Sequence, residues 1–264
     1  MVIPCWNYHI KDKMNEVIVL GKKLKKTYVL SKEERIQSVD GIDIEIRKGE
    51  FVVIMGDSGS GKSTLLYLLC GLETITEGEI CLGLEKINDM SEDELAVYRR
   101  KNIGFVFQSI NLIPNMTLLE NIVLPGLLTG DSYKVVASRA KELLKKLNLE
   151  DQADKLPAQM SGGQQQRGAI VRALINSPDI IFADEPTGAL NSSNSKAVIE
   201  TIKQLNESGQ TVIMVTHDHK MAAYGERVLY IRDGKILSEK KNDKKLSIPE
   251  REKQLATWLN EKGW

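Results

Sequence analysis

A glycine-rich segment between a buried strand and a helix constrains the fold more than any other feature. Residues 56–64 read Gly-Asp-Ser-Gly-Ser-Gly-Lys-Ser-Thr, after the apolar run Phe51–Met55 and before the helical run Leu65–Cys70. In this setting the glycines let successive backbone N–H groups point inward, and the helix N-terminus adds positive potential toward a bound phosphate. The sequence therefore predicts an α/β fold that binds a nucleotide at residues 56–64.

All nine residues of this segment are expected to contact the nucleotide. They are Gly56, Asp57, Ser58, Gly59, Ser60, Gly61, Lys62, Ser63 and Thr64. Lys62 is expected to reach the β- and γ-phosphates, and Ser63 to ligate Mg²⁺. From these roles we expect ATP and Mg²⁺ as ligands. The structural alternative is that the segment is only a glycine turn between strand and helix.

Two adjacent carboxylates, Asp184 and Glu185, close a second buried strand, predicted over Asp179–Ala183. A buried pair of acids is costly unless something pairs with it, so a cation is expected there. Phosphoryl transfer would use Asp184 to hold Mg²⁺, directly or through water, and Glu185 to polarise the attacking water. The alternative is that both acids only cap the following helix.

Two further polar residues follow strand-like runs. His217 comes after the buried run Thr211–Thr216, and Gln108 comes after Ile103–Phe107. Ligands of parallel sheets bind outside the carboxyl ends of the strands, where both side chains are expected. We predict that Glu185, His217 and Gln108 are catalytic, and that Gln108 orients water or joins Ser63 and Asp184 around Mg²⁺.

The segment Met160–Arg167, Met-Ser-Gly-Gly-Gln-Gln-Gln-Arg, resembles the signature of ABC ATPases. With the phosphate loop, Gln108, the acidic pair and His217 in the same order, the resemblance covers about residues 16–237. It implies that Tyr28 stacks on adenine. It also implies that the nucleotide held by a second subunit is contacted by Ser161, Gly162, Gly163 and Gln164. A homodimer with composite sites is expected, although Ser161 could simply start a helix.

Three shorter stretches narrow the resemblance. Residues 105–114 (Phe-Val-Phe-Gln-Ser-Ile-Asn-Leu-Ile-Pro), 185–190 (Glu-Pro-Thr-Gly-Ala-Leu) and 214–218 (Met-Val-Thr-His-Asp) look like the ATPases of macrolide exporters, antimicrobial-peptide exporters and lipoprotein-release transporters. This group implies a separate membrane permease with few transmembrane helices and a large extracytoplasmic domain. The stretch after Gln108 would then receive the coupling helix of the permease.

The sequence departs from the family pattern at two positions. Asn191 stands where aspartate is usual, and Gly168 replaces an apolar residue of the signature helix. Asparagine caps a helix as well as aspartate does, so the fold should persist while charge-dependent communication between the two ATP sites is altered. Gly168 is expected to cost about 0.5–1 kcal/mol within a helix.

The organisation follows from the strand and helix patterns. Residues 1–13 are predicted as an N-terminal tail, 14–240 as the ATPase domain and 241–264 as a linker with a short helix. Val17–Leu20 and Ile42–Ile46 indicate an antiparallel edge sheet beside a mainly parallel core. Helical spacing between the buried runs Phe51–Met55 and Ile180–Ala183 predicts an inserted helical subdomain over about residues 109–172.

The last segment carries helix signals. Ser247, Pro249 and Glu250 are an N-cap, a first-turn proline and a capping-box acid, so a helix is predicted from this point. Leu255, Trp258 and Leu259 form one apolar stripe. We expect this stripe to dock on the protein's own core, on a dimer mate or on the membrane partner.

Composition excludes some functions. Lysine and arginine together number 36, as do aspartate and glutamate, so no net charge favours nucleic acid. The longest apolar run, about eight residues, is far below the roughly 20 that span a bilayer. We predict a cytoplasmic protein, peripheral on the inner face of the cell membrane, whose three cysteines, Cys5, Cys70 and Cys81, are reduced.

Two other functions share these motifs. One is a regulatory or cell-division ATPase that drives an extracytoplasmic hydrolase activator through a similar permease and moves no cargo. The other is a soluble ABC ATPase that acts on ribosomes or DNA, a class that usually carries tandem ATPase units or long coiled-coil insertions. This chain shows neither feature.

Overall fold

The computed structural model describes residues 17–31 and 34–264 and contains two compact units. Unit 1 comprises Met1–Leu95 and Ile213–Trp264, and unit 2 comprises Ala96–Val212. The predicted tail, residues 1–13, lies outside the described residues. The predicted domain boundaries stay a prediction, and each unit is considered by itself.

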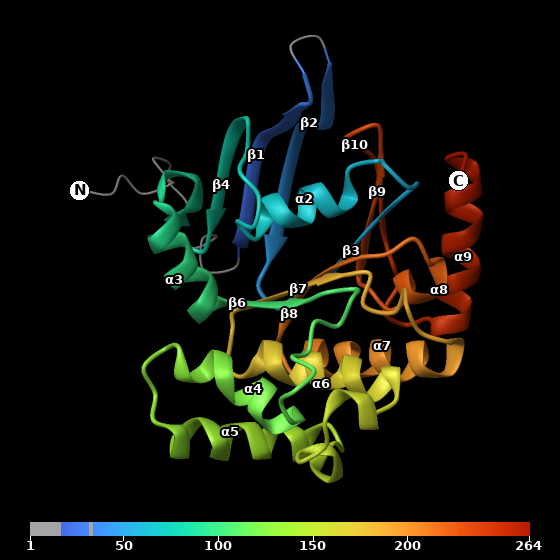
Figure 1. The fold of residues 1–264 in the computed structure, drawn as a ribbon. Coiled ribbons are helices and arrows are strands. Elements are labelled where there is room, and N and C mark those ends of the chain that lie inside the picture. The colour runs from blue at the N-terminus through green and yellow to red at the C-terminus, as the bar shows by residue number, and fades with distance from the viewer. Residues whose placement is uncertain (1–16, 32–33) are drawn as a thin grey trace. The chain divides into compact units, whose positions relative to one another are not determined.

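An antiparallel sheet forms one part of unit 1 (Figure 1). Its strands, in the order β2-β1-β4-β5, are β1 (Val17–Val29), β2 (Arg35–Arg47), β4 (Glu77–Leu82) and β5 (Glu85–Lys86). Ile42, Ile44 and Ile46 alternate as buried residues with exposed polar ones along β2, as a strand with one wet face requires. The antiparallel edge sheet is confirmed, and its first two strands are longer than the apolar pattern indicated.

The second sheet of unit 1 carries the buried strands. Its strands lie in the order β10-β9-β3-β8. They are β3 (Phe51–Gly56), β8 (Thr211–Val215), β9 (Arg227–Arg232) and β10 (Lys235–Lys241). The first two residues of β8 belong to unit 2, and its other three belong to unit 1. β3 pairs with β9 in parallel, and every residue of β3 is buried. A continuous apolar run suits such a strand because both of its faces are covered. The short helices of unit 1 are α2 (Lys62–Leu69), η1 (Ile87–Asp89) and α8 (His219–Ala222).

Unit 2 combines two parallel strands with a set of helices. Its elements are the end of α3 (Glu92–Asn102), β6 (Ile103–Val106), α4 (Leu118–Leu127), α5 (Tyr133–Lys146), η2 (Glu150–Gln152), η3 (Pro157–Gln159), α6 (Gly162–Leu174), β7 (Ile180–Asp184) and α7 (Ser192–Glu207). β6 and β7 are parallel, and α6 packs against α4, α5 and α7. Helices therefore fill much of the predicted helical segment 109–172, and the predicted α/β fold with parallel and antiparallel sheets is confirmed.

Gly168 has a packing reason within unit 2. A methyl group in its place would lie 2.5 Å from Cδ1 of Leu118, which belongs to α4. Both residues are buried, so α6 and α4 approach closely at this point. The intrinsic helix cost of glycine is thus offset by a contact that a larger residue would disrupt.

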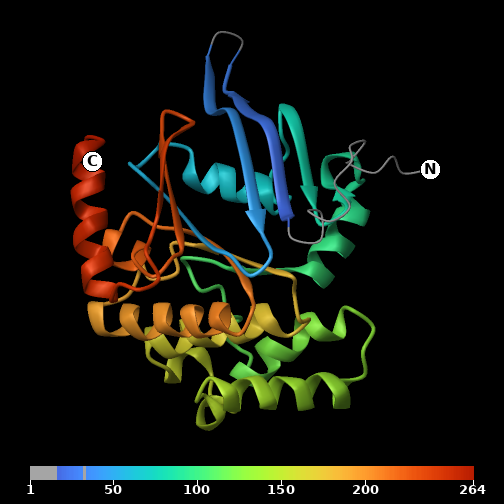
Figure 2. The same ribbon diagram turned by 180° about the vertical axis from the view of Figure 1, so that it is seen from behind.

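The C-terminal helix forms as predicted. α9 (Ile248–Glu261) follows Ser247, whose backbone N–H and hydroxyl donate to Glu250 Oε2 at 2.8 and 2.6 Å. It packs against α8 of the same unit and runs beside β9 and β10 (Figure 2). Leu255 and Leu259 are fully buried, while Trp258 is half-buried and meets the ring of Tyr230 edge-on at 6.3 Å. Docking on the protein's own core is confirmed.

We expect Leu255→Ala to lower the free energy of unfolding by about 3 kcal/mol, because a buried leucine loses contacts and leaves a cavity. Urea titration followed by tryptophan fluorescence measures the change. The control is Gln254→Ala, which truncates the exposed neighbouring side chain and should stay within about 0.5 kcal/mol of the parent. Equal stability of the two variants would show that the packing of α9 contributes little.

The prediction of three reduced cysteines is wrong for Cys81, which is disulfide-bonded. Cys70 is buried and its thiol donates to Tyr67 O at 3.4 Å, and Cys5 lies outside the described residues. Spacing along the chain did not indicate a disulfide, because bonding depends on which thiols the fold brings within reach. Across residues 17–31 and 34–264, no helix has both the length and the apolar character needed to cross a membrane.

Candidate nucleotide-binding site

The predicted phosphate loop connects β3 to α2 in unit 1. β3 ends at Gly56 and α2 begins at Lys62, so the loop leads directly into a helix N-terminus. Gly59 and Gly61 have left-handed φ angles of 78° and 99°, which side chains other than glycine rarely adopt. The Lys62 ammonium group donates to the backbone oxygen of Asp57 at 2.6 Å, so it lies against the loop. The strand, loop and helix predicted from sequence are therefore all present.

Backbone from two other segments holds the loop in place. A methyl group on Gly61 would lie only 2.1 Å from the backbone oxygen of Ser38 in β2. In the turn between β9 and β10, the Gly234 N–H donates to Ser60 O at 3.1 Å, and Gly234 O accepts from Asp40 N at 2.8 Å. This contact was not predicted, although Asp-Gly between two strand-like runs is a recognisable hairpin signal.

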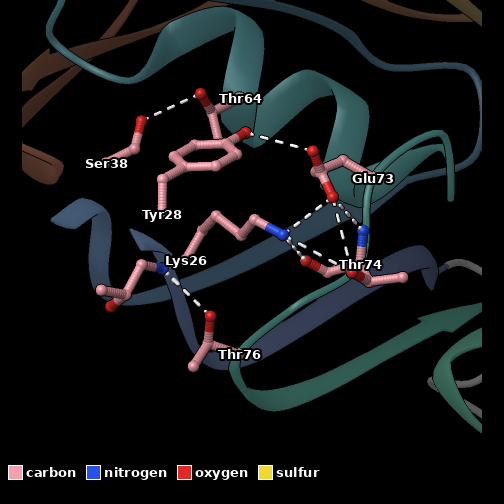
Figure 3. Close-up of polar contacts among 8 residues, drawn as sticks. Lys26, Tyr28, Ser38, Thr64, Glu73, Thr74 and Thr76 are labelled. Carbon is pink, nitrogen blue, oxygen red and sulfur yellow. Dashed lines mark hydrogen bonds and ion pairs between the residues drawn. The ribbon is translucent and has the colours of Figure 1, made fainter. Parts of the chain in front are cut away.

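Tyr28 belongs to a polar cluster beside the loop, which we call the Tyr28 cluster and define as Lys26, Tyr28 and Glu73 (Figure 3). The Tyr28 hydroxyl donates to Glu73 Oε2 at 3.2 Å. Lys26 Nζ donates to Glu73 Oε1 at 2.8 Å and lies 5.0 Å from the centroid of the Tyr28 ring. The hydrogen bond from Lys26 is the main reason that the pKa of Glu73 lies below its ordinary value, so this carboxylate stays ionised.

His217 emerges at the same sheet edge as the phosphate loop. The N–H of Thr216, just after β8, donates to the backbone oxygen of Ile54 in β3 at 3.2 Å. Both strands then leave the sheet: β3 continues into the loop at Gly56, and β8 continues through His217. Asp218 caps α8 by accepting from Lys220 N at 2.8 Å. The fold of unit 1 thus places His217 where strand order predicted it.

The acidic pair lies at the end of β7 in unit 2. Asp184 is its last residue and is buried, and Glu185 has a left-handed φ of 44°. A methyl group on Gly188 would lie 2.9 Å from Gln108 Nε2 and 3.1 Å from Glu185 Oε2, so the side chains of Gln108 and Glu185 meet around Gly188. The cap of the following helix α7 is Asn191, whose Oδ1 accepts from Asn194 N at 3.0 Å. The two acids therefore do not cap α7.

The predicted signature residues form the start of α6. Ser161 is the N-cap: its hydroxyl accepts from Gln164 N at 3.3 Å, and its N–H donates to Gln164 Oε1 at 2.8 Å. A methyl group on Gly163 would lie 2.9 Å from the Asn194 side chain, and one on Gly162 would lie 3.1 Å from Leu190. The two glycines thus allow α6 to approach the segment that begins α7, which is a packing role separate from any contact with a nucleotide.

Two side chains of α6 that sequence reasoning missed hold the segment around Gln108. Gln166 is buried and its Nε2 donates to Phe107 O at 3.1 Å. Arg172 donates to Ile110 O at 3.0 Å and to Asn111 O. Both loop residues have left-handed φ angles, 65° and 54°, which is unusual for a β-branched residue such as isoleucine. Burial lowers the pKa of the Arg172 guanidinium, which nonetheless stays charged at neutral pH.

The two units together present the parts of a P-loop ATPase. Unit 1 carries a phosphate loop with an aromatic residue beside it, and unit 2 carries a buried aspartate, a glutamate with a neighbouring glutamine and a glycine-lined helix N-terminus.

A family model described as "ABC transporter" matches residues 39–188. An ABC transporter ATP-binding protein of Methanocaldococcus jannaschii, MJ0796, is 48% identical over 228 residues, covering 83% of this chain and 95% of the relative. The lipoprotein-releasing system ATP-binding protein LolD of Aquifex aeolicus is 46% identical over 199 residues, covering 75% of this chain and 89% of the relative. The macrolide export ATP-binding/permease protein MacB of Brucella melitensis is 48% identical over 204 residues, 77% of this chain but only 32% of that relative.

A solved dimer of MJ0796, described as a post-hydrolysis state bound to ADP and Pi, has a TM-score of 0.78 and 46% identity, covering 86% of this chain and 99% of that one. The chain therefore belongs to the ABC transporter family. It is an ATP-binding ATPase subunit of a transporter, similar to the ATP-binding proteins of the MacB and LolD systems.

Proposed function

We propose that this chain works as a homodimer that hydrolyses ATP to drive a separate membrane permease, for export or for transmission of force across the membrane. The permease would have few transmembrane helices and a large extracytoplasmic domain, and the chain would lie on the inner face of the cell membrane. The main support for a permease partner is a groove next to Gln108, lined in part by Phe107.

The groove lies within unit 2 and has a volume of about 340 Å³. Phe105, Phe107, Ile113 and Pro125 supply apolar lining, and Arg100 and Arg172 add positive charge. The Arg100 guanidinium also donates to Leu128 O at 2.8 Å, so this side chain contacts the C-terminal end of α4. An apolar cleft with a few polar groups suits a short amphipathic helix, which is the expected shape of a coupling segment.

The groove is connected to the predicted catalytic residues by short covalent and hydrogen-bonded paths. Phe107 lines the groove and directly precedes Gln108, and its backbone oxygen accepts from Gln166 of α6. Arg172 lines the groove and belongs to the helix that begins at Ser161. A segment that docks here therefore touches residues adjacent to both Gln108 and the signature helix.

In the proposed cycle, the phosphate loop binds ATP through its backbone N–H groups and Lys62. Glu185 polarises the attacking water, with Gln108 beside it, and His217 contacts the terminal phosphate. The Ser161 hydroxyl accepts a hydrogen bond from Gln164 but keeps its own proton to donate to a phosphate held by the second subunit. The post-hydrolysis dimer of MJ0796 supports a dimeric arrangement for this chain.

Ser63, Gln108 and Asp184 are the residues proposed to hold Mg²⁺. A hydroxyl, an amide oxygen and a carboxylate fit this ion, which prefers oxygen ligands, and Asp184 is a buried acid at a strand end. When bound, Mg²⁺ neutralises part of the charge on the phosphate oxygens.

Ile113→Glu should lower binding of the chain to permease-containing vesicles by about tenfold or more, because it places a carboxylate in the apolar part of the groove. Val135→Glu is the matched control, since Val135 is an exposed apolar residue of unit 2 that does not line the groove. Binding is measured by flotation with native membranes stripped of peripheral proteins, and the bound integral protein is identified by mass spectrometry.

Retained ATPase activity in both variants would show that they are folded. Equal flotation of Ile113→Glu and the parent would remove the groove from the proposed function. Recovery of a partner without transmembrane segments would contradict a membrane role. Transport of cargo and transmission of force are then separated by reconstituting the complex and following whether solute crosses the bilayer.

A further inference from the structure

The Tyr28 cluster fixes an aromatic ring from two directions. Lys26 and Tyr28 lie two residues apart on β1, so their side chains project from the same face of the strand. Glu73, which follows α2, accepts from both: from the Tyr28 hydroxyl at 3.2 Å and from Lys26 Nζ at 2.8 Å. Lys26 also donates to Thr74 O at 2.7 Å, so its ammonium group is held firmly (Figure 3).

The geometry leaves one face of the ring for a ligand. The Lys26 ammonium group lies over the ring, 5.0 Å from its centroid, and so covers one face. The hydrogen bond from the Tyr28 hydroxyl to Glu73 restricts rotation of the side chain. A flat base that stacks on Tyr28 therefore has only the face opposite Lys26 available.

The strand that pairs with β1 at Tyr28 contacts the phosphate loop segment. Tyr28 pairs with Ile36 of β2, and two residues further along β2 the Ser38 hydroxyl donates to Thr64 Oγ1 at 2.9 Å. Thr64 is the last residue of the phosphate loop segment, inside α2. β2 thus links Tyr28 to the segment that is expected to hold the phosphates.

We propose that Lys26 and Glu73 are positioning residues, which hold the Tyr28 ring so that the nucleotide base stacks on the face away from Lys26. The proposal rests on the proposed function, in which the chain binds ATP at the phosphate loop, and on the expectation from the family resemblance that Tyr28 stacks on the base. It assigns the ion pair to nucleotide recognition, although neither charged side chain would touch the nucleotide.

The test compares ATP with inorganic triphosphate, which has the phosphates but no base. Glu73→Ala and Tyr28→Phe should each weaken ATP binding about 3- to 10-fold, the scale of one lost hydrogen bond, and leave triphosphate binding unchanged. GTP binding should weaken by the same factor as ATP binding, because stacking does not read the edge of the base. Tyr28→Ala, which removes the ring, should weaken ATP more than Tyr28→Phe. Titration calorimetry on the full chain measures all of these affinities.

If Glu73 acts through the Tyr28 hydroxyl, the double variant Tyr28→Phe/Glu73→Ala should bind ATP about as well as Glu73→Ala alone. Glu77→Ala is the matched control. It breaks an ion pair of similar length, between Lys25 Nζ and Glu77 Oε2 at 2.8 Å. Lys25 directly precedes Lys26 on β1. This variant should bind ATP like the parent.

Equal losses for ATP and triphosphate would overturn the proposal, because they would mean that the ion pair supports the phosphate loop instead of the ring. Unchanged ATP binding in both Glu73→Ala and Tyr28→Phe would also overturn it. Tyr28→Phe removes one oxygen atom, so it tests the proposal even if Glu73→Ala fails to fold. Failure of the proposed function would look different, since the parent chain would then bind ATP but would not float with permease-containing vesicles, whatever the Glu73 and Tyr28 variants do.

Discussion

Glu185→Gln should lower ATP turnover about a hundredfold or more and leave ATP affinity close to that of the parent. The amide keeps the shape of the carboxylate but cannot take a proton from the attacking water, and a positioned base contributes about 10²–10⁴ in rate. The site supports this role, because Glu185 follows a buried strand and its Oε2 lies near the same Gly188 as Gln108 Nε2. Slow hydrolysis should also trap the ATP-bound dimer.

Steady-state phosphate release measures the rate, and size-exclusion chromatography with ATP and Mg²⁺ measures the dimer. Glu200→Gln is the control, because Glu200 is an exposed residue of α7 that makes only a 3.9 Å ion pair with Lys196 among the described contacts. It should hydrolyse ATP at the parent rate. A Glu185→Gln protein that hydrolyses normally, or that stays monomeric with ATP, would remove Glu185 from the catalytic role.

Gly61→Ala should weaken ATP binding at least about a hundredfold. Its φ of 99° disfavours any L side chain, and the added methyl group would lie 2.1 Å from the Ser38 backbone oxygen, where no flexible side chain can move aside. Relief of this clash must displace either the phosphate loop or β2. Either movement withdraws the N–H groups and Lys62 from the geometry that a phosphate requires.

The matched control is Gly41→Ala. Gly41 also has a left-handed φ, 70°, but a methyl group there meets nothing within 4 Å. It should cost about 1 kcal/mol of unfolding free energy from backbone strain alone and leave ATP affinity unchanged. Calorimetric ATP titration and thermal unfolding of both variants distinguish strain from collision. Similar ATP affinity in the two variants would mean that the close approach to Ser38 is not needed for binding.

Much of the fold was predictable because local sequence carries its physical cause. The buried runs at residues 51–55 and 180–183 became parallel strands, and Ser247 with Glu250 became a capping box that begins α9. The lengths of β1 and β2 were underestimated, since their outer halves are polar and are held by pairing with each other rather than by apolar burial. Pairing of this kind is a property of two segments, and neither reveals it alone.

The amino-acid sequence by itself determined which chemical groups this protein presents: a glycine-rich phosphate loop, adjacent acids after a strand, and a helix that starts with serine and glycines. These are local patterns, so residue type and spacing suffice to read them. Only the tertiary structure decided that Glu73 and Lys26 meet at Tyr28, that Gly234 holds Ser60, and that Arg172 binds the turn after Gln108. Each of these contacts joins residues more than 40 positions apart, because strand pairing and helix packing bring together groups whose separation along the chain carries no signal.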